Sequence, residues 1–306
     1  MELITELRRK LIQAKRTESG AVRRSACGFV SPALHYLRIQ RQWMLAVQQS
    51  LSHPNSLVAT KLVQGYCRVF PFEYPIYVSL REGYMSTGSF VYYKRVGLKP
   101  RKEYFAVSLD VTDPLILWPL VVHELAHCWL SHTDHVDRIS SSLLETFNGS
   151  YSEPEDRVEE AVCDAVATRL TGAQYPLAFA MKLWLDLPSK ETGYHPFNSF
   201  RLELMAQTLD DMHLFEEAGQ VRDIAATSSS SGWNDEPISP SLQALIHVAK
   251  GLPPYASLAH RLPCNEAINR SWANLYNGKE PSLSRIKVTS NDLKNALEGW
   301  TMPTDA

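Results

Sequence analysis

The sequence predicts an α+β fold in which helices flank a small antiparallel sheet. Three observations support this fold class. Apolar residues recur at helical spacing near the start of the chain. Short aromatic and β-branched runs separated by Gly and Pro follow between residues 75 and 109. Helical periodicity then resumes after residue 113. With 306 residues, 44% of them hydrophobic and 21% charged, the chain can bury a substantial core.

The individual elements follow from local patterns. Residues 1–65 are predicted to form helices, with a break at Ser19-Gly20. Asp113-Pro114 is a helix start, and Pro119 either kinks that helix or begins the next one. A polar loop is predicted over 149–156. The expected strands are Pro75–Leu80, Phe90–Tyr93 and Tyr104–Leu109, and the expected later helices are Arg157–Thr171, Ala178–Leu187 and Phe200–Ala218.

These elements divide into four segments. Residues 1–65 are an N-terminal helical region and 66–226 hold the core with the sheet. The serine-rich stretch that ends at Gly232 predicts a flexible linker over 227–240, and 241–306 is a C-terminal helical region.

Charge, hydropathy and cysteine content narrow the function classes. The net charge is −2, so a nucleic-acid partner is not expected. Residues 1–45 carry nine Lys/Arg against three Glu, which favours a solvated helix face over a surface for a regulatory partner. The most apolar stretch, Leu115–Leu130, contains three polar or ionisable residues in its middle and does not predict a membrane span. Five cysteines without a CxxC pair and no evident signal peptide predict a cytoplasmic protein.

The motif with the clearest chemistry is His123-Glu124-Leu125-Ala126-His127. On a helix, positions i and i+4 share a face, so both imidazoles can reach one zinc ion while Glu124 faces the same cleft. The motif is embedded in an apolar helix, where two histidines and a glutamate would be costly to bury without a shared partner. This HExxH helix predicts one zinc per chain.

A catalytic zinc site needs a third protein ligand and one open position. Leu130 and Thr133 stand where a metzincin would have Gly and His, which excludes that class. Glu160, on a second predicted helix, is the favoured ligand, with Glu159 and Glu155 as competitors. Asp164 lies one turn after Glu160 and can accept the outer N–H of a ligand histidine.

Three patches together resemble the gluzincin metallopeptidases of the CaaX prenyl protease, HtpX and Oma type. They are HELAHCWLSHT at 123–133, EAVCDA at 160–165 and HPFNSFR at 195–201, which matches an HPxxxxR element. The resemblance covers about residues 123–205 and implies a zincin-like (minigluzincin) core. It also implies that His195 stabilises the oxyanion and that Arg201 braces the zinc-ligand helix through a carboxylate. Phe197 and the lack of membrane spans depart from the familiar relatives.

The expected function is zinc-dependent endopeptidase activity on a protein or peptide substrate. Glu124 would act as general base towards a zinc-activated water, and Tyr194 is a second candidate donor to the oxyanion beside His195. Tyr104–Leu109 is the expected edge strand that aligns an extended substrate. The alternative is a non-catalytic zinc-binding regulatory protein on the same scaffold, which binds a protein or nucleic-acid partner through its basic N-terminal helices.

Other residues near the motif are given structural roles. His132 and His135 are expected at a solvated helix end. Cys128 and Cys163 are expected to act as small buried hydrophobic residues and not as thiolate ligands.

Overall fold

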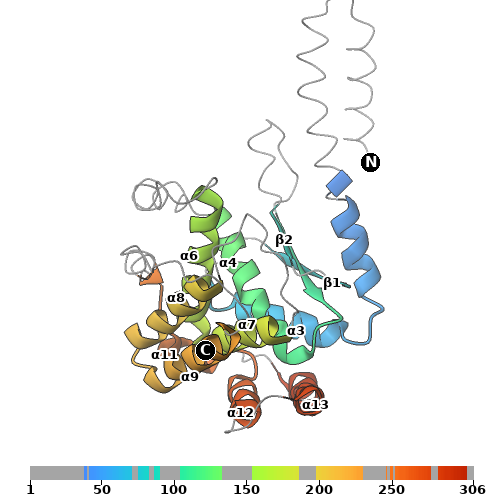
Figure 1. Ribbon diagram of the computed structural model, residues 1–306. Coiled ribbons are helices and arrows are strands. Elements are labelled where there is room, and N and C mark those ends of the chain that lie inside the picture. The colour runs from blue at the N-terminus through green and yellow to red at the C-terminus, as the bar shows by residue number, and fades with distance from the viewer. Residues whose placement is uncertain are drawn as a thin grey trace, which may run out of the picture.

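The computed structural model describes residues 38–39, 41–70, 75–82, 86–89, 104–132, 154–185, 198–229, 246, 249–250, 252–276 and 282–301. The expectations for residues 1–37, for the strand Phe90–Tyr93, for most of the linker and for Tyr194 and His195 therefore lie outside the described residues. The described chain is a mostly helical α+β fold (Figure 1). None of its helices is both long and apolar enough to cross a membrane.

The sheet has three described strands: β1 (Ile76–Arg81), β2 (Ser86–Ser89) and β3 (Phe105–Asp110), in the order β1-β3-β2. Strand β2 runs antiparallel to β3, but β1 runs parallel to it, with Val78 opposite Val107. The prediction of a wholly antiparallel sheet was therefore wrong. Short aromatic and β-branched runs locate strands but carry no signal of direction, because the side-chain alternation is the same in both pairings.

Strand β3 is central, so the prediction that this segment forms the edge strand was also wrong. All six of its residues are buried. A strand covered on both faces is typically a continuous apolar run, and the segment Phe105-Ala106-Val107 fits that pattern. Among the described strands, the outer positions belong to β1 and β2.

A tight turn joins the sheet to the helix that carries the HExxH motif. Asp110 Oδ1 accepts hydrogen bonds from the backbone N–H and the hydroxyl of Thr112 at 2.8 and 2.6 Å. The 3₁₀ helix η2 (Leu115–Leu120) follows Pro114 and contains Pro119. The α-helix α4 (Val121–His132) then begins two residues after that proline, which cannot donate a backbone hydrogen bond. Trp118 Nε1 donates to the backbone oxygen of Asp110 at 3.1 Å, which ties η2 to the end of β3.

Helix α6 (Pro154–Thr171) packs against α4 (Figure 1). It begins at Pro154, so the predicted loop over 149–156 is wrong for its last three residues. Proline in the first turn followed by acidic residues favours a helix N-terminus at this point. The middle of α6 is buried on all sides and is rich in small residues, which allow neighbouring helices to approach closely: Ala161, Cys163, Ala165 and Ala167.

The turn after α6 depends on a glycine. Gly172 has φ of 60°, and a Cβ at this position would lie 2.9 Å from Cγ of Tyr255. A residue with a side chain would therefore be strained and would also clash with the Tyr255 ring. The turn leads directly into α7 (Gln174–Leu185), where the sequence had predicted a helix from 178 to 187.

The predicted helix over 200–218 is two helices, α8 (Asn198–Asp211) and α9 (Phe215–Ser229). His213, with φ of 63°, separates them. Its N–H donates to the Asp210 oxygen at 2.9 Å, and the Leu214 N–H donates to the Leu209 oxygen at 3.0 Å. This pair of bonds is a Schellman motif, which ends a helix. Because α9 extends to Ser229, the predicted linker is helical in its first three residues.

The C-terminal elements join the same core as the central helices. They are α11 (Tyr255–Leu258), η3 (Ala259–Arg261), α12 (Asn265–Tyr276) and α13 (Leu283–Gly299). Near the other end of the described chain, α3 (Ser56–Cys67) packs against α13, and Lys61 Nζ donates to the backbone oxygens of Glu298 and Trp300 at 2.6 and 2.8 Å. One buried apolar cluster extends from Val58 to Leu297 and holds α4 and α6 in place.

Candidate metal centre

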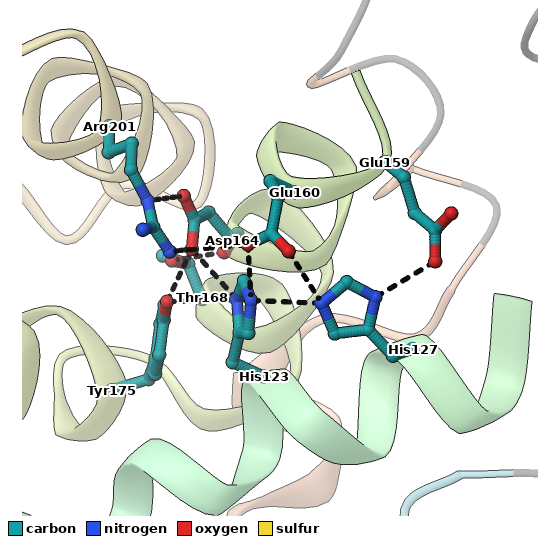
Figure 2. A network of polar contacts seen from close by, with 8 residues as sticks. All are labelled: His123, His127, Glu159, Glu160, Asp164, Thr168, Tyr175 and Arg201. Atoms are coloured by element: carbon teal, nitrogen blue, oxygen red, sulfur yellow. Dashed lines mark hydrogen bonds and ion pairs between the residues drawn. The ribbon is translucent and has the colours of Figure 1, made fainter. Parts of the chain in front are cut away.

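Helix α4 brings its two histidines to one face. His123 and His127 are one turn apart, with ring centroids separated by 4.8 Å and ring planes nearly perpendicular. Their Nε2 atoms are 3.2 Å apart (Figure 2). The helix is fixed by apolar neighbours on its opposite side, since Val121, Val122 and Leu125 are fully buried. The buried side of α4 therefore sets the direction in which both imidazoles point.

Helix α6 supplies a carboxylate to the same point. Glu160 Oε2 lies 3.0 Å from His123 Nε2, and Glu160 Oε1 lies 3.2 Å from His127 Nε2. In the described part of the chain, His123, His127 and Glu160 form a group whose candidate ligand atoms all lie within 4.8 Å of one another. The structure thus brings together the three residues that the sequence proposed as metal ligands.

The outer nitrogens of both rings face carboxylates. His123 Nδ1 is 2.9 Å from Asp164 Oδ1, and His127 Nδ1 is 2.9 Å from Glu159 Oε1. An ionised carboxylate can only accept a hydrogen bond, so each Nδ1 must carry a hydrogen. In a neutral imidazole the Nε2 atom is then an acceptor with a bare lone pair.

Three acceptors therefore converge at the centre of the cluster. They are the two Nε2 atoms and the carboxylate of Glu160, all within 3.0 to 3.2 Å of a neighbour. Acceptors at this separation repel one another unless a positive charge lies between them. Either a shared proton or a metal ion satisfies that requirement, and two imidazoles with one carboxylate match the donor set that zinc prefers.

The ionisation of these groups reflects their mutual contacts. Burial alone would lower the pKa of His123, but hydrogen bonds to the Asp164 and Glu160 carboxylates, together with the charges of these groups, outweigh it and raise the pKa. Burial also opposes ionisation of Glu160. The hydrogen bonds and charges of His123 and His127 outweigh that effect and hold the pKa of Glu160 well below its ordinary value. Without a metal, these contacts favour the protonated form of the His123 imidazole.

Asp164 anchors His123 from behind. It is fully buried and accepts hydrogen bonds from Arg201 Nε at 2.6 Å and Arg201 Nη2 at 2.8 Å (Figure 2). Burial would raise the pKa of Asp164, but the charge and hydrogen bonds of Arg201, followed by those of His123, lower it to about 2. Arg201 is only 6% exposed and comes from α8, so a buried ion pair links α6 to α8 behind the candidate metal ligands.

Tyr175 completes this anchor and was missed from the sequence. Its hydroxyl donates to Asp164 Oδ1 and lies 3.1 Å from His123 Nδ1. Its ring stacks on that of His123, with centroids 5.9 Å apart. Tyr175 belongs to α7, eleven residues after Asp164, and its position depends on the turn at Gly172. A tyrosine among the apolar residues of that helix gave no pattern by which its contact could have been found.

Of the two competing ligands, Glu159 takes a different position from Glu160. Glu159 contacts the Nδ1 side of His127, which is the side of the ring away from the convergence point. The side chain of Glu155 is outside the described residues, as are those of His132 and His135. Burial raises the pKa of the Cys163 thiol to about 12, so this side chain remains a neutral thiol beside His127.

Of the candidate catalytic residues, Glu124 lies on the same helix as the two histidines. Glu124 follows His123 on α4 and is partly exposed, whereas His123 is 7% exposed. It makes no hydrogen bond or ion pair with the residues that the structure describes. His195 and Tyr194 lie outside the described residues.

No protein-family model, no curated protein sequence and no solved structure matches this chain.

Proposed function

We propose that the chain is a zinc-dependent endopeptidase with a zincin-like core. The observation that carries the proposal is the convergence of three acceptors, His123 Nε2, His127 Nε2 and the Glu160 carboxylate, beside a partly exposed glutamate. Two histidines and one carboxylate leave an open position, as in catalytic zinc sites, whereas a structural site normally closes with four protein ligands.

The residues of the cluster fit zinc, both in the type of ligand atoms and in the carboxylates that hold the imidazole rings in place. His123, His127 and Glu160 would hold the ion, and Asp164 and Glu159 fix the rings so that Nε2 is available. A zinc ion bound there would supply a Lewis acid that activates water and polarises a substrate carbonyl.

Glu124 is the proposed general base. It is next to His123 on α4, it is not engaged by another described side chain, and it retains access to solvent. Glu124 would accept the proton of the attacking water and deliver it to the leaving amine. His195, with Tyr194, remains the proposed donor to the oxyanion on the basis of the family resemblance.

The substrate proposal changes with the sheet order. Strand β3 is paired on both sides and cannot receive another strand, but β2 pairs only with β3 among the described strands. Strand β2 also packs against α4, the helix that carries His123 and Glu124. The outer edge of β2 is therefore the proposed position for an extended peptide, which would add to the sheet by backbone hydrogen bonds.

The test compares the full-length zinc-loaded protein with its Glu124→Gln variant on a mixture of denatured proteins. Mass spectrometry of newly formed N-termini gives the rate of peptide-bond cleavage. Glutamine keeps the size of the side chain but cannot take a proton, so cleavage should fall about 100-fold or more while zinc remains bound.

Cleavage by Glu124→Gln at the wild-type rate would contradict the proposed mechanism. Stoichiometric zinc with no cleavage by either protein would instead favour the alternative of a non-catalytic zinc-binding regulator.

A further inference from the structure

The two candidate ligand histidines are held by unequal carboxylates. Asp164, which holds His123, is fully buried and receives two hydrogen bonds from Arg201. Glu159, which holds His127, has a side chain that is 33% exposed. In the described part of the chain, no lysine or arginine pairs with Glu159.

The presence or absence of an arginine partner determines how much negative charge each carboxylate contributes to the metal centre. The guanidinium of Arg201 lies 2.6 and 2.8 Å from the two oxygens of Asp164, so its positive charge cancels that of the aspartate. Among the described residues, no lysine or arginine cancels the charge of Glu159 in this way. Of the two outer carboxylates, Asp164 is neutralised by an arginine, and Glu159 is not neutralised by any lysine or arginine that the structure describes.

The position of Glu159 excludes a role as ligand to the same ion. Its Oε1 atom is 2.9 Å from His127 Nδ1, whereas His127 Nε2 faces His123 and Glu160 on the other side of the ring. Adjacent residues on a helix point about 100° apart, so Glu159 and Glu160 approach His127 from different directions (Figure 2). One helix thereby contacts both nitrogens of the same imidazole.

We propose that Glu159 is the positioning residue of His127 and that its charge, which no described lysine or arginine neutralises, slows the loss of the metal. This inference rests on the metal centre proposed above. A carboxylate that accepts the Nδ1–H fixes the tautomer and the orientation of the ring and makes Nε2 a more basic ligand. Asp164 shares the first two effects, but the third is weakened there by Arg201.

The experiment measures zinc transfer from the full-length protein to an excess of a chromogenic chelator. Glu159→Gln retains an amide oxygen that can accept the Nδ1–H but removes the charge, and Glu159→Ala removes both. We expect zinc release to be about 10-fold faster in Glu159→Gln and up to about 100-fold faster in Glu159→Ala.

The matched control is Glu203→Gln. Glu203, on α8, is a carboxylate of similar exposure, 23%, and it pairs with Arg222 at 3.1 Å. Its loss changes the net charge equally, so its zinc release should stay at the wild-type rate. Cobalt-substituted protein gives a second readout, because reorientation of His127 in Glu159→Ala should shift the visible absorption bands, whereas Glu203→Gln should leave them unchanged.

The outcomes separate this inference from the proposed metal centre. Release rates within about twofold of wild type for both Glu159 variants would overturn the role of Glu159 and leave the metal centre intact. Complete absence of zinc from Glu159→Ala would make Glu159 a ligand and would also overturn the inference. Failure of the wild-type protein to bind zinc would overturn the metal centre itself.

Discussion

Among the described residues, Asp164 is the one on which the candidate metal centre depends most. His123, Tyr175 and both ends of the Arg201 fork converge on its two oxygens. Its charge is acceptable in a fully buried position because Arg201 pairs with it. The same side chain therefore orients a candidate ligand and joins α6 to α7 and α8.

Replacement of Asp164 by alanine should affect both metal binding and stability. Loss of the partner of His123 Nδ1 should weaken zinc binding about 10- to 100-fold. It also removes the nearer of the two carboxylates that pair with the buried Arg201 guanidinium and leaves Glu160 at 3.9 Å, and breaking a buried pair typically costs about 3–5 kcal/mol. Zinc titration and urea denaturation of the metal-free protein measure the two effects separately.

The control for this prediction is Tyr175→Phe. It removes one hydrogen bond to Asp164 but leaves the Arg201 pair, so its stability loss should be on the order of 1 kcal/mol. A metal-free Asp164→Ala protein as stable as wild type would show that the buried pair contributes little to the fold.

At the scale of single elements, helix existence was easier to predict from the sequence than helix ends. The HExxH helix, the Glu160 helix and the strands at 76–81 and 105–110 follow from their periodicity and composition. The break at His213 does not, because a Schellman motif usually shows a glycine and here a histidine takes the left-handed position. Strand direction was also missed, because it depends on contacts between strands that are distant in sequence.

His213 and Gly172 both have a left-handed backbone conformation, and substitutions at the two positions should change the stability of the protein in opposite directions. His213→Gly should stabilise the protein by up to about 1 kcal/mol, because glycine adopts φ of 63° without the steric cost paid by histidine. Gly172→Ala should destabilise it by more than about 1 kcal/mol, because alanine would be strained at φ of 60° and would also approach the Tyr255 ring. Thermal denaturation of both variants measures these changes, and the same sign for both would contradict the backbone argument.

At the scale of the whole molecule, the candidate metal ligands were easier to predict from the sequence than the residues that hold those ligands in position. His123, His127, Glu160 and Asp164 were found because helical spacing places chemistry on one face. Tyr175 and the position of Glu159 were missed, because they depend on how α6 packs against α4 and how α7 packs against α6. The capping of α13 by Lys61 depends on a contact across 236 residues of sequence, which no local pattern encodes.

Zinc should stabilise the entire described core, because its proposed ligands come from both α4 and α6. Binding to the folded state alone adds about 2.7 kcal/mol when free zinc is 100 times the dissociation constant. In a chain of this size such a gain should raise the melting temperature by about 5 °C or more. Differential scanning fluorimetry with added zinc or chelator measures the shift, and His127→Ala should show none. An equal shift in that variant would place the stabilising zinc elsewhere.

The central claim is that His123, His127 and Glu160 together hold one metal ion. The most direct measurement is metal content by mass spectrometry after equilibrium dialysis of the metal-free protein against zinc. We predict one zinc per chain for the wild type, close to none for His127→Ala and Glu160→Ala, and retained zinc for Glu124→Gln. Stoichiometric zinc in both His127→Ala and Glu160→Ala, or none in the wild type, would contradict the claim.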